Sequence, residues 1–298
     1  MKKFAIAMVI IILVGVVITG IGCAVFFTSG FDAIDVEYKE AQLFETDEEI
    51  SSLNLKLRNA HKIVLERGEK CTVKYIDTSV TSFSISAANG KLNISESDWS
   101  WKNWLKRIFY RFKSTEVVIT VPENTVLDIT GDLAGATDAT LPAWQYGNIN
   151  LEVSGAAKID ATDITADAIS LDVSGSTYLS ISSGTVNSLK MRASGSVEMN
   201  CNGLECPSVD IRSSGSSKIT LSGTGRELTL NASGSSKIWA KDFQLERADI
   251  DASGSVNAEL KVSERLKVKT SGSSHIAYWG NPEVVRSTSG SSTIEQRG

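Results

Sequence analysis

The sequence is poor in the residues that most enzyme sites and disulfide scaffolds need. It contains only two histidines, four cysteines and four prolines among 298 residues, and aromatic residues make up 7%. Two histidines, His61 and His275, argue against a histidine-rich metal site or a histidine-based catalytic apparatus. Four cysteines are too few for a disulfide scaffold in a chain of this length. A formal net charge of −5 argues against nucleic acid as a partner.

Motifs with a known chemistry are also absent. The sequence has no Walker loop, dinucleotide fingerprint, nucleophile elbow or metal-ligand spacing. Aspartates gather at Asp160, Asp163, Asp167 and Asp172, but no histidine and no cluster of Arg and Lys at one repeat position accompanies them, so surface solvation is the favoured interpretation. We therefore predict no catalytic residue, metal ligand or cofactor, and we expect that the chain is not an enzyme.

The chain begins with one long hydrophobic segment. Residues 4–27 form an uncharged run of 24 residues that follows Lys2 and Lys3 and precedes Asp32. At about 1.5 Å per residue, a helix of this length reaches roughly 36 Å and crosses a hydrocarbon core of about 30 Å. We expect residues 1–30 to form a cytoplasmic tip and a transmembrane anchor. The lysines before the span place the N-terminus in the cytoplasm and the following domain outside the cell.

Two other interpretations of this segment fit the residues less well. A cleaved signal peptide has a hydrophobic region of about 7 to 15 residues, which is shorter than this one. A lipoprotein acceptor at Cys23 would follow Gly22, but Gly20 stands where a leucine-like residue is expected, and the hydrophobic run continues past the cysteine. A retained anchor is the favoured prediction, and cleavage stays an open alternative.

A short motif, Ser-Gly-Ser, returns at regular intervals through the second half of the chain. Successive motif glycines are 18 to 20 residues apart, and a further glycine in the sequence LAGAT fits the same spacing. A period of this length is the signature of a repeat architecture built from stacked units. The glycines that define the repeat are Gly135, Gly155, Gly175, Gly195, Gly215, Gly234, Gly254, Gly272 and Gly290.

Hydrophobic and polar residues alternate around each motif. Apolar or small side chains recur six, four and two residues before the glycine and four after it, as in Ile169, Leu171, Val173 and Leu179. Alternation at every second position indicates β-strands with one buried face. A unit of about 20 residues cannot bury this face alone, so like units must stack. We predict an all-β fold, a single-stranded β-helix (β-solenoid) of about 18 to 20 residues per rung, over residues 126–298.

The Ser-Gly-Ser motif is expected to form a corner of each rung. Glycine permits the positive φ that such a corner needs, and serine hydroxyls can bond turn backbone groups. Opposite charges one unit apart, such as Asp172 and Arg192, are expected to discourage register slips. Cys201 and Cys206 stand where other rungs have aliphatic residues, which favours core positions; a disulfide between them is the alternative.

Residues 31–125 also alternate, but without the regular repeat. Runs such as LNLKL at 53–57 and VVITV at 117–121 read as strands. Asn89-Gly90 lies between two alternating runs and predicts a hairpin turn. We expect this region to form irregular first rungs or a small β cap over the open end of the β-helix.

One insertion, residues 97–115, differs from the rest of this region. Its hydrophobic residues recur at helical spacing and its basic residues are concentrated, which is typical of a helix lying on a membrane surface. The alternative is a cap whose apolar stripe packs on the end of the β-helix while the basic residues face solvent. The residues predicted to contact anionic lipid or wall polymer are Trp99, Trp101, Lys102, Trp104, Lys106, Arg107, Arg111 and Lys113.

Several phrases of the sequence resemble a known family. They are VLERGEKCTVKY, AANGKLNISE, VVITVPENTVLDITG and the repeated VSGS, ASGS and TSGS corners. Together with the anchor, they resemble the bacterial families named as putative adhesins of unknown function, of the head-GIN auto-transporter type. The resemblance implies a single-stranded β-helix at the cell surface, linked to adhesion or envelope maintenance. It supplies no catalytic residue.

These observations favour a non-enzymatic, single-pass surface protein whose extracellular β-helix is an adhesin-like interaction or spacer module. Candidate contact residues are Tyr178, Trp239, Tyr278 and Trp279. The expected partners are membrane lipid, through the N-terminal helix, and a cell-envelope glycan or another surface protein. Two alternatives stay open: a polysaccharide-active β-helix enzyme, which needs a compact row of carboxylates and basic residues on one face, and an accessory component of an envelope-stress sensing system.

Overall fold

The computed structural model describes residues 34–35, 37–59, 61–78, 81–97, 110–111 and 114–297. The predicted anchor at 4–27 lies outside these residues, as do all the predicted contact residues of the insertion except Arg111. Within the described ranges, no helix has the length and hydrophobicity needed to span a bilayer.

The described chain is all-β, as the alternation predicts. Its strands are β1 (Ile34–Asp35), β2 (Tyr38–Thr46), β3 (Ser52–Leu57), β4 (His61–Gly68), β5 (Cys71–Thr78), β6 (Ser82–Ala88), β7 (Lys91–Ser97), β8 (Tyr110–Arg111), β9 (Thr115–Pro122), β10 (Leu127–Leu141), β11 (Gln145–Glu205), β12 (Ser208–Gly272), β13 (His275–Trp279), β14 (Glu283–Thr288) and β15 (Thr293–Gln296). β11 and β12 are long because the pairing between rungs continues through several corners without a break.

The chain divides into two compact units. One comprises residues 1–37 and 99–112, and its described part is the parallel pair of β1 with β8. The other comprises residues 38–98 and 113–298 and contains all the remaining strands. The features described below all belong to the second unit.

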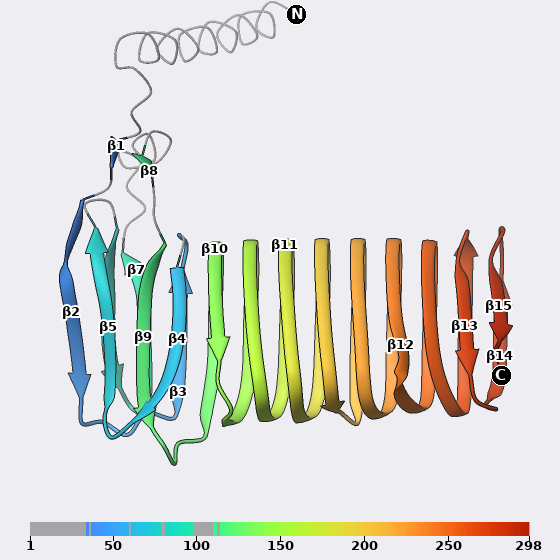
Figure 1. Cartoon of the computed structure of the whole chain (residues 1–298), viewed down its shortest axis with the longest axis horizontal. Helices are drawn as coiled ribbons and strands as arrows, with labels where there is room; N and C mark the ends of the chain where they lie inside the picture. The colour runs from blue at the N-terminus through green and yellow to red at the C-terminus, as the bar shows by residue number, and fades with distance from the viewer. Residues whose placement is uncertain are drawn as a thin grey trace, which may run out of the picture. The chain divides into compact units, whose positions relative to one another are not determined.

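Residues 127–297, here called the stack, coil through successive rungs that pair with one another in parallel. β10 pairs with β11 so that Gly135 lies opposite Gly155, and β11 pairs with β12 in the same way. Residues that pair are one repeat apart in the sequence, so each rung lies directly beside the next (Figure 1). The later, shorter rungs keep this pairing, with Asn257 opposite His275. Pairing between rungs satisfies the backbone groups that a single rung leaves open.

The region before the stack adds two further rungs and an antiparallel edge. β3 and β4 pair in parallel with β10, β7 pairs with β3, and β9 pairs with β4. β5 then pairs antiparallel with β9, and β2 pairs antiparallel with β5 (Figure 1). β6 and β7 form an antiparallel hairpin whose turn residues, Asn89 and Gly90, have φ of 54° and 73°. This is the hairpin that Asn-Gly predicts.

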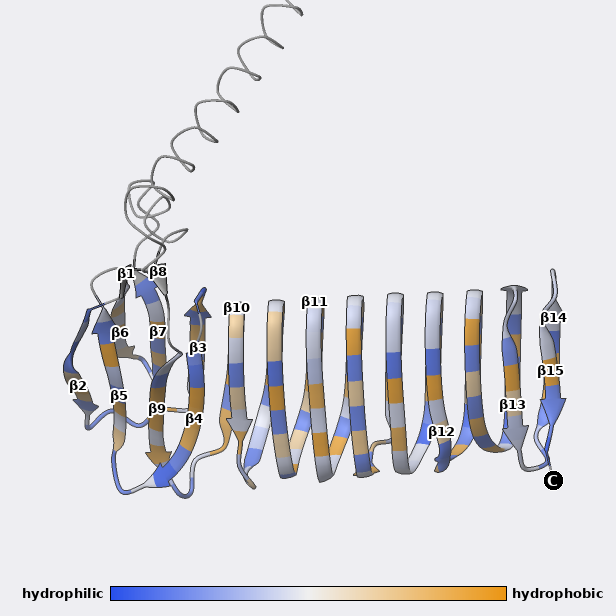
Figure 2. Ribbon diagram, turned by 45° about the horizontal axis from the view of Figure 1, so that its top comes forward, coloured by the Kyte–Doolittle hydropathy of each residue, from blue (hydrophilic) through white to orange (hydrophobic). Residues whose placement is uncertain are grey.

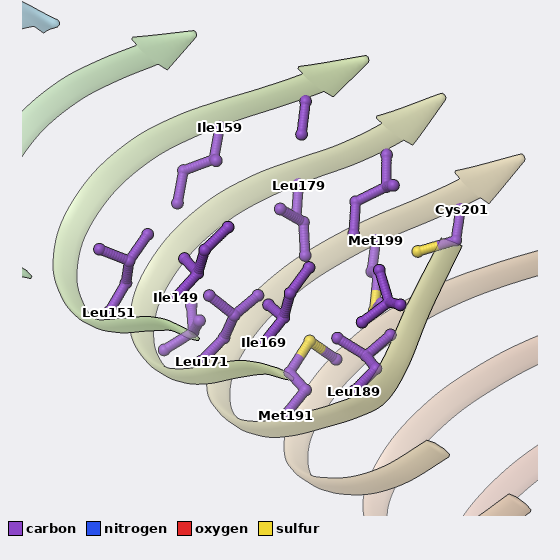
Figure 3. Close-up of a cluster of buried hydrophobic side chains, with 14 of the residues drawn as sticks. Ile149, Leu151, Ile159, Ile169, Leu171, Leu179, Leu189, Met191, Met199 and Cys201 are labelled. Atoms are coloured by element: carbon purple, nitrogen blue, oxygen red, sulfur yellow. The ribbon is translucent and has the colours of Figure 1, made fainter. Parts of the chain in front are cut away.

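The side chains that the alternation predicts to face inward are buried in the regular rungs. Ile169, Leu171 and Leu179 are at most 4% exposed, and Figure 3 shows them stacked on the equivalent side chains of neighbouring rungs. Hydrophobic and hydrophilic residues alternate along each rung (Figure 2). Burial of one such side chain contributes about 1.5–3 kcal/mol, and this burial exists only when neighbouring rungs are present. The last rung departs from the pattern, because Val284 and Ile294 are only partly buried.

Three cysteines, Cys71, Cys201 and Cys206, are buried as free thiols. The core-filling prediction for Cys201 and Cys206 is therefore confirmed, and these two residues do not form the alternative disulfide. Burial raises the pKa of Cys71 to about 11 and also raises the pKa of Cys201 and of Cys206. The three thiols consequently stay protonated at neutral pH and are poor nucleophiles.

Candidate functional site

The nine repeat glycines lie in one column along the stack. Each has a positive φ, between 73° and 108°. A Cβ added at Gly195 would lie 2.5 Å from the carbonyl oxygen of Gly175, and the first glycine of the column, Gly135, stacks on the backbone of Arg58 and Asn59. Glycine is thus required for two reasons, the left-handed backbone and the close approach of the neighbouring rung.

Two columns of serines flank the glycines on the surface. Their side chains are exposed or half-exposed, and neighbouring rungs are about 4.8 Å apart. A row of hydroxyls at this interval offers both hydrogen-bond donors and acceptors to a long polar ligand. The column before the glycines is Ser154, Ser174, Ser194, Ser214, Ser233, Ser253, Ser271 and Ser289, and the column after them is Ser176, Ser196, Ser216, Ser235, Ser255, Ser273 and Ser291.

A long open groove, here called the first groove, follows the residues just after the glycines. Its volume is about 810 Å³, and it extends through successive rungs from Ala136 to Lys237, with His61 at one end. Its charged and aromatic lining comes from the third residue after each glycine: Asp138, Lys158, Tyr178, Glu198, Lys218 and Lys237. The groove runs across the strands, so its polar groups repeat from rung to rung.

Opposite charges pair across the rungs of the first groove. Lys218 Nζ lies 2.7 Å from Glu198 Oε1, and the hydrogen bond from Lys218 lowers the pKa of Glu198. Asn200 Nδ2 donates to the hydroxyl of Tyr178 at 3.4 Å. Glu198 and Lys218 are thus engaged with each other, and the serine hydroxyls provide the regular polar surface along the groove.

A second groove follows the residues just before the glycines. One part has a volume of about 510 Å³ and is lined from Asp172 to Ser253. A part of about 310 Å³ continues it toward Lys56, and the two parts share Asp172 and Arg192. A charged row lines this second groove: it starts at Lys56, opposite Asp132, and continues with the third residue before successive glycines, namely Asp132, Glu152, Asp172, Arg192, Arg212, Asn231 and Asp251.

This charged row corrects one expectation from the sequence. No cluster of Arg and Lys at one repeat position was expected, yet Arg192 and Arg212 lie directly opposite each other on neighbouring rungs. Asp132 lies opposite Glu152 in the same way. In the sequence, Arg192 is one repeat unit from Asp172 as well as from Arg212. The opposite pair was recognised, and the grouping of like charges was not.

A buried histidine cluster lies at the end of the first groove. His61 Nε2 donates to Glu96 Oε1 at 2.8 Å, and His61 Nδ1 lies 2.7 Å from Thr115 Oγ1. Asn59 Nδ2 also donates to Glu96 at 2.6 Å, and the ring of Phe83 packs edge-on against the imidazole. Burial alone would raise the pKa of Glu96, but hydrogen bonds from His61, Asn59 and a backbone N–H lower it overall. The sequence alone does not reveal this cluster, because the partners of His61 are 35 and 54 residues away.

The aromatic candidate contacts differ in accessibility. Tyr178 is 36% exposed and lines the first groove. Tyr278 is buried and belongs to the core, so its predicted contact role is wrong. Lysine side chains lie over Trp239 and Trp279, with ammonium-to-ring distances of 5.4 and 4.6 Å, which occupies one face of each ring.

Acidic residues in the described part of the chain do not gather as metal ligands. No group of three or more His, Cys, Asp or Glu that could hold a metal ion occurs there. Asp160 instead pairs with Lys158 on the same strand.

Comparison with known proteins places this architecture in a family. The family model described as "Putative auto-transporter adhesin, head GIN domain" matches residues 48–217 and 189–282, which is well over half of the chain. The chain belongs to this head GIN family. A search of curated proteins found no match.

Solved structures share the fold of this head GIN protein. A structure titled as a putative adhesin from Parabacteroides merdae is 12% identical, with a TM-score of 0.56, and the match covers 89% of this chain and 99% of that one. A structure titled as a putative lipid binding protein from Parabacteroides distasonis is 15% identical, with a TM-score of 0.53 and coverage of 89% and 99%. A second structure from that organism, titled as a putative adhesin, is 17% identical, with a TM-score of 0.51 and coverage of 89% and 100%. At these identities the likeness shows the fold alone.

Proposed function

We propose that this head GIN protein is a non-enzymatic binding module of the cell surface, and that its grooves receive an extended polymer of the cell envelope. We infer that residues 126–298 form a single-stranded β-helix with 18 to 20 residues per rung, held at the membrane by a transmembrane helix over 4–27 with the β-helix outside the cell. The adhesin titles of the structural neighbours and the family description support a surface role.

The observation that carries the proposal is the direction of the first groove. Pockets for small molecules are compact cavities that enclose most of the ligand. This groove instead crosses rung after rung from Ala136 to Lys237 and repeats its hydroxyls at the rung spacing. Such a surface suits a polymer whose own hydroxyl groups repeat, and a cell-envelope glycan has this chemistry.

Blocking the first groove tests the proposal. Ser176→Trp and Ser216→Trp, introduced together, place two large rings among the exposed serines of the groove. Thr229→Trp is the matched control, because Thr229 is exposed on a strand and lines neither groove. The full chain in detergent micelles is sedimented with purified envelope polysaccharide. We expect the double variant to lose binding and the control to keep it; equal binding by both, or no binding by the unaltered chain, contradicts the proposal.

We also propose that the basic aromatic residues of 97–115 contact anionic lipid or wall polymer beside the anchor. Their concentrated positive charge and tryptophans support this role. Residues 31–298, without the anchor, are mixed with vesicles of anionic or neutral lipid and floated on a density gradient. We expect flotation with anionic vesicles and its loss when Lys102, Lys106 and Arg107 are changed to Gln; absence of any flotation contradicts the proposal.

The charged row of the second groove favours one second candidate, a polysaccharide-active enzyme. Asp132, Glu152 and Asp172 precede Arg192 and Arg212 on one face, and glycoside cleavage commonly uses a pair of carboxylates. Incubation with acidic and neutral polysaccharides, followed by measurement of reducing ends, separates the two functions. Release that disappears in Glu152→Gln supports the enzyme.

A further inference from the structure

Two arginines in the second groove, Arg192 and Arg212, do not form close ion pairs. Arg192 Nη1 lies 3.9 Å from Asp172, and Arg212 Nε lies 3.6 Å from Asp210. Neither guanidinium donates a hydrogen bond to another residue of the described chain. Both side chains are about half exposed, at 53% and 55%. Their N–H donors are therefore available to a ligand in the groove.

Other charged side chains on the outer face of the stack are paired more closely. Lys267 lies 2.7 Å from Asp249, and Lys269 lies 3.3 Å from Asp251, in each case on the neighbouring rung. Arg247 similarly lies between two glutamates on adjacent rungs, at 3.2 and 3.0 Å. Opposite charges on neighbouring rungs are thus frequent on this surface, whereas like charges directly opposite on neighbouring strands are unfavourable. Arg192 lies opposite Arg212, as Asp132 lies opposite Glu152, and an anion between the two arginines would relieve their repulsion.

The surroundings of the two arginines complete an anion site. Neighbouring rungs are about 4.8 Å apart, so both guanidinium groups can contact one oxyanion, each with parallel N–H donors. Ser194 and Ser214 lie opposite each other beside them, and Asn231 lines the next rung. Asp210 Oδ1, buried and without a hydrogen-bond partner, faces Arg212 Nε and leaves the outer donors of that guanidinium free.

The acidic neighbours limit how many anions the groove can accept. Asp132, Glu152 and Asp172 occupy the preceding rungs, and Asp251 lies beyond Asn231. A chain with a negative charge on every sugar would be repelled by these carboxylates when it lies along the groove. A glycan with acidic groups separated by neutral sugars avoids this repulsion.

We propose that Arg192 and Arg212 bind a single carboxylate or phosphate group of an acidic glycan in the second groove. This inference rests on the proposed binding function and adds the ligand class and the residues that recognise it. The concave groove favours a narrow polymer chain over a second copy of the protein, because two concave surfaces do not fit each other. Binding forms and breaks no covalent bond.

Binding measurements on the full chain in detergent micelles test this site. The probes are hyaluronan oligosaccharides, which carry a carboxylate on alternate sugars, an oligosaccharide whose phosphodiester groups are separated by neutral sugars, and neutral dextran. Arg192→Gln with Arg212→Gln removes both guanidiniums, and Arg247→Gln is the control for loss of one exposed positive charge. We expect the double variant to weaken binding of at least one anionic probe by about tenfold or more, and the control to bind as the unaltered chain does. Replacement of both arginines by Lys keeps the charge and should restore only part of the affinity.

The outcomes separate this inference from the proposed function. A preference for the carboxylate or the phosphate probe identifies which anion the site accepts. Equal binding of neutral and anionic probes, or undiminished binding by the double variant, overturns the anion site and leaves the proposed function standing. Absence of binding to all probes and to envelope polysaccharide overturns both. If sedimentation shows that the double substitution only dissociates a dimer, the surface binds a second copy of the protein, and the glycan inference is overturned.

Discussion

The imidazole of His61 lies 2.8 Å from the carboxylate of Glu96, and their side chains are only 2% and 5% exposed. Through its other ring nitrogen, His61 also contacts Thr115. Glu96 stands just before the insertion of residues 97–115, and Thr115 is the last residue of that insertion. His61 therefore joins the two ends of the insertion, at a place opposite Thr137, two residues after the first glycine corner of the stack.

Removal of this link is expected to destabilise the fold. His61→Ala leaves the Glu96 carboxylate buried without its main partner, and such a change costs about 3–5 kcal/mol. His275→Ala is the matched control, because His275 is 39% exposed and pairs with Glu295 at the surface. Thermal unfolding followed by circular dichroism compares the two variants. Equal, small shifts in Tm for both would show that the His61 cluster contributes little.

The same pair predicts a pH dependence with a definite sign. The pKa of Glu96 lies below its ordinary value of 4.5, so its carboxylate stabilises the folded state fully above that ordinary value. This contribution is lost as the pH falls through the lowered pKa. We expect the unaltered chain to be more stable than Glu96→Gln at pH 7, and the difference to shrink under acid conditions. Urea unfolding of both proteins across this range checks it; a difference that grows on acidification contradicts the assignment.

The glycine column predicts a strong effect from a single added side chain. Gly195→Val combines a φ of 106° with a Cβ 2.5 Å from the Gly175 carbonyl oxygen. The expected loss of stability is about 3 kcal/mol or more. Ser194→Val, at the neighbouring exposed position, should change stability little. Chemical denaturation measures both, and unchanged stability of the glycine variant would mean that the corner is not packed as described.

Replacing a buried hydroxyl that has no partner is expected to increase the stability of the fold. Thr177 is 4% exposed, and its Oγ1 has no hydrogen-bond partner, whereas the same position of the next rung holds Val197. Thr177→Val should therefore stabilise the fold by about 1 kcal/mol. Ser213 differs, because it donates to Ser217 at 2.6 Å. Ser213→Ala should destabilise the fold, and a stabilising effect there would show that the two hydroxyl environments are not distinct.

Much of the architecture could be predicted because it depends on local pattern. Alternation around Gly175 gave the buried positions at Ile169, Leu171 and Leu179, and the structure buries all three. Asn89-Gly90 gave a hairpin. One failed prediction goes against this same pattern: Tyr278 stands six residues after Gly272, as Cys201 stands after Gly195, and both are buried, although Tyr278 was expected at the surface.

The candidate sites were less predictable, because their residues are distant in the sequence and meet only when the rungs stack. The two grooves exist only because the rungs stack, and their lining combines single residues from many rungs. Arg192 and Arg212 are unremarkable in the sequence and become a pair through the register of neighbouring strands. His61 meets Glu96 and Thr115 only after the first rungs have formed.

By itself, the sequence determined the all-β character, the length of the repeat and the residues that face inward, because two-residue alternation and a recurring glycine act through local backbone geometry. Tertiary structure alone decided which outward side chains become neighbours, where the grooves run and which polar groups are left without partners. Those features depend on register and on burial by other rungs, and no short stretch of sequence contains that information.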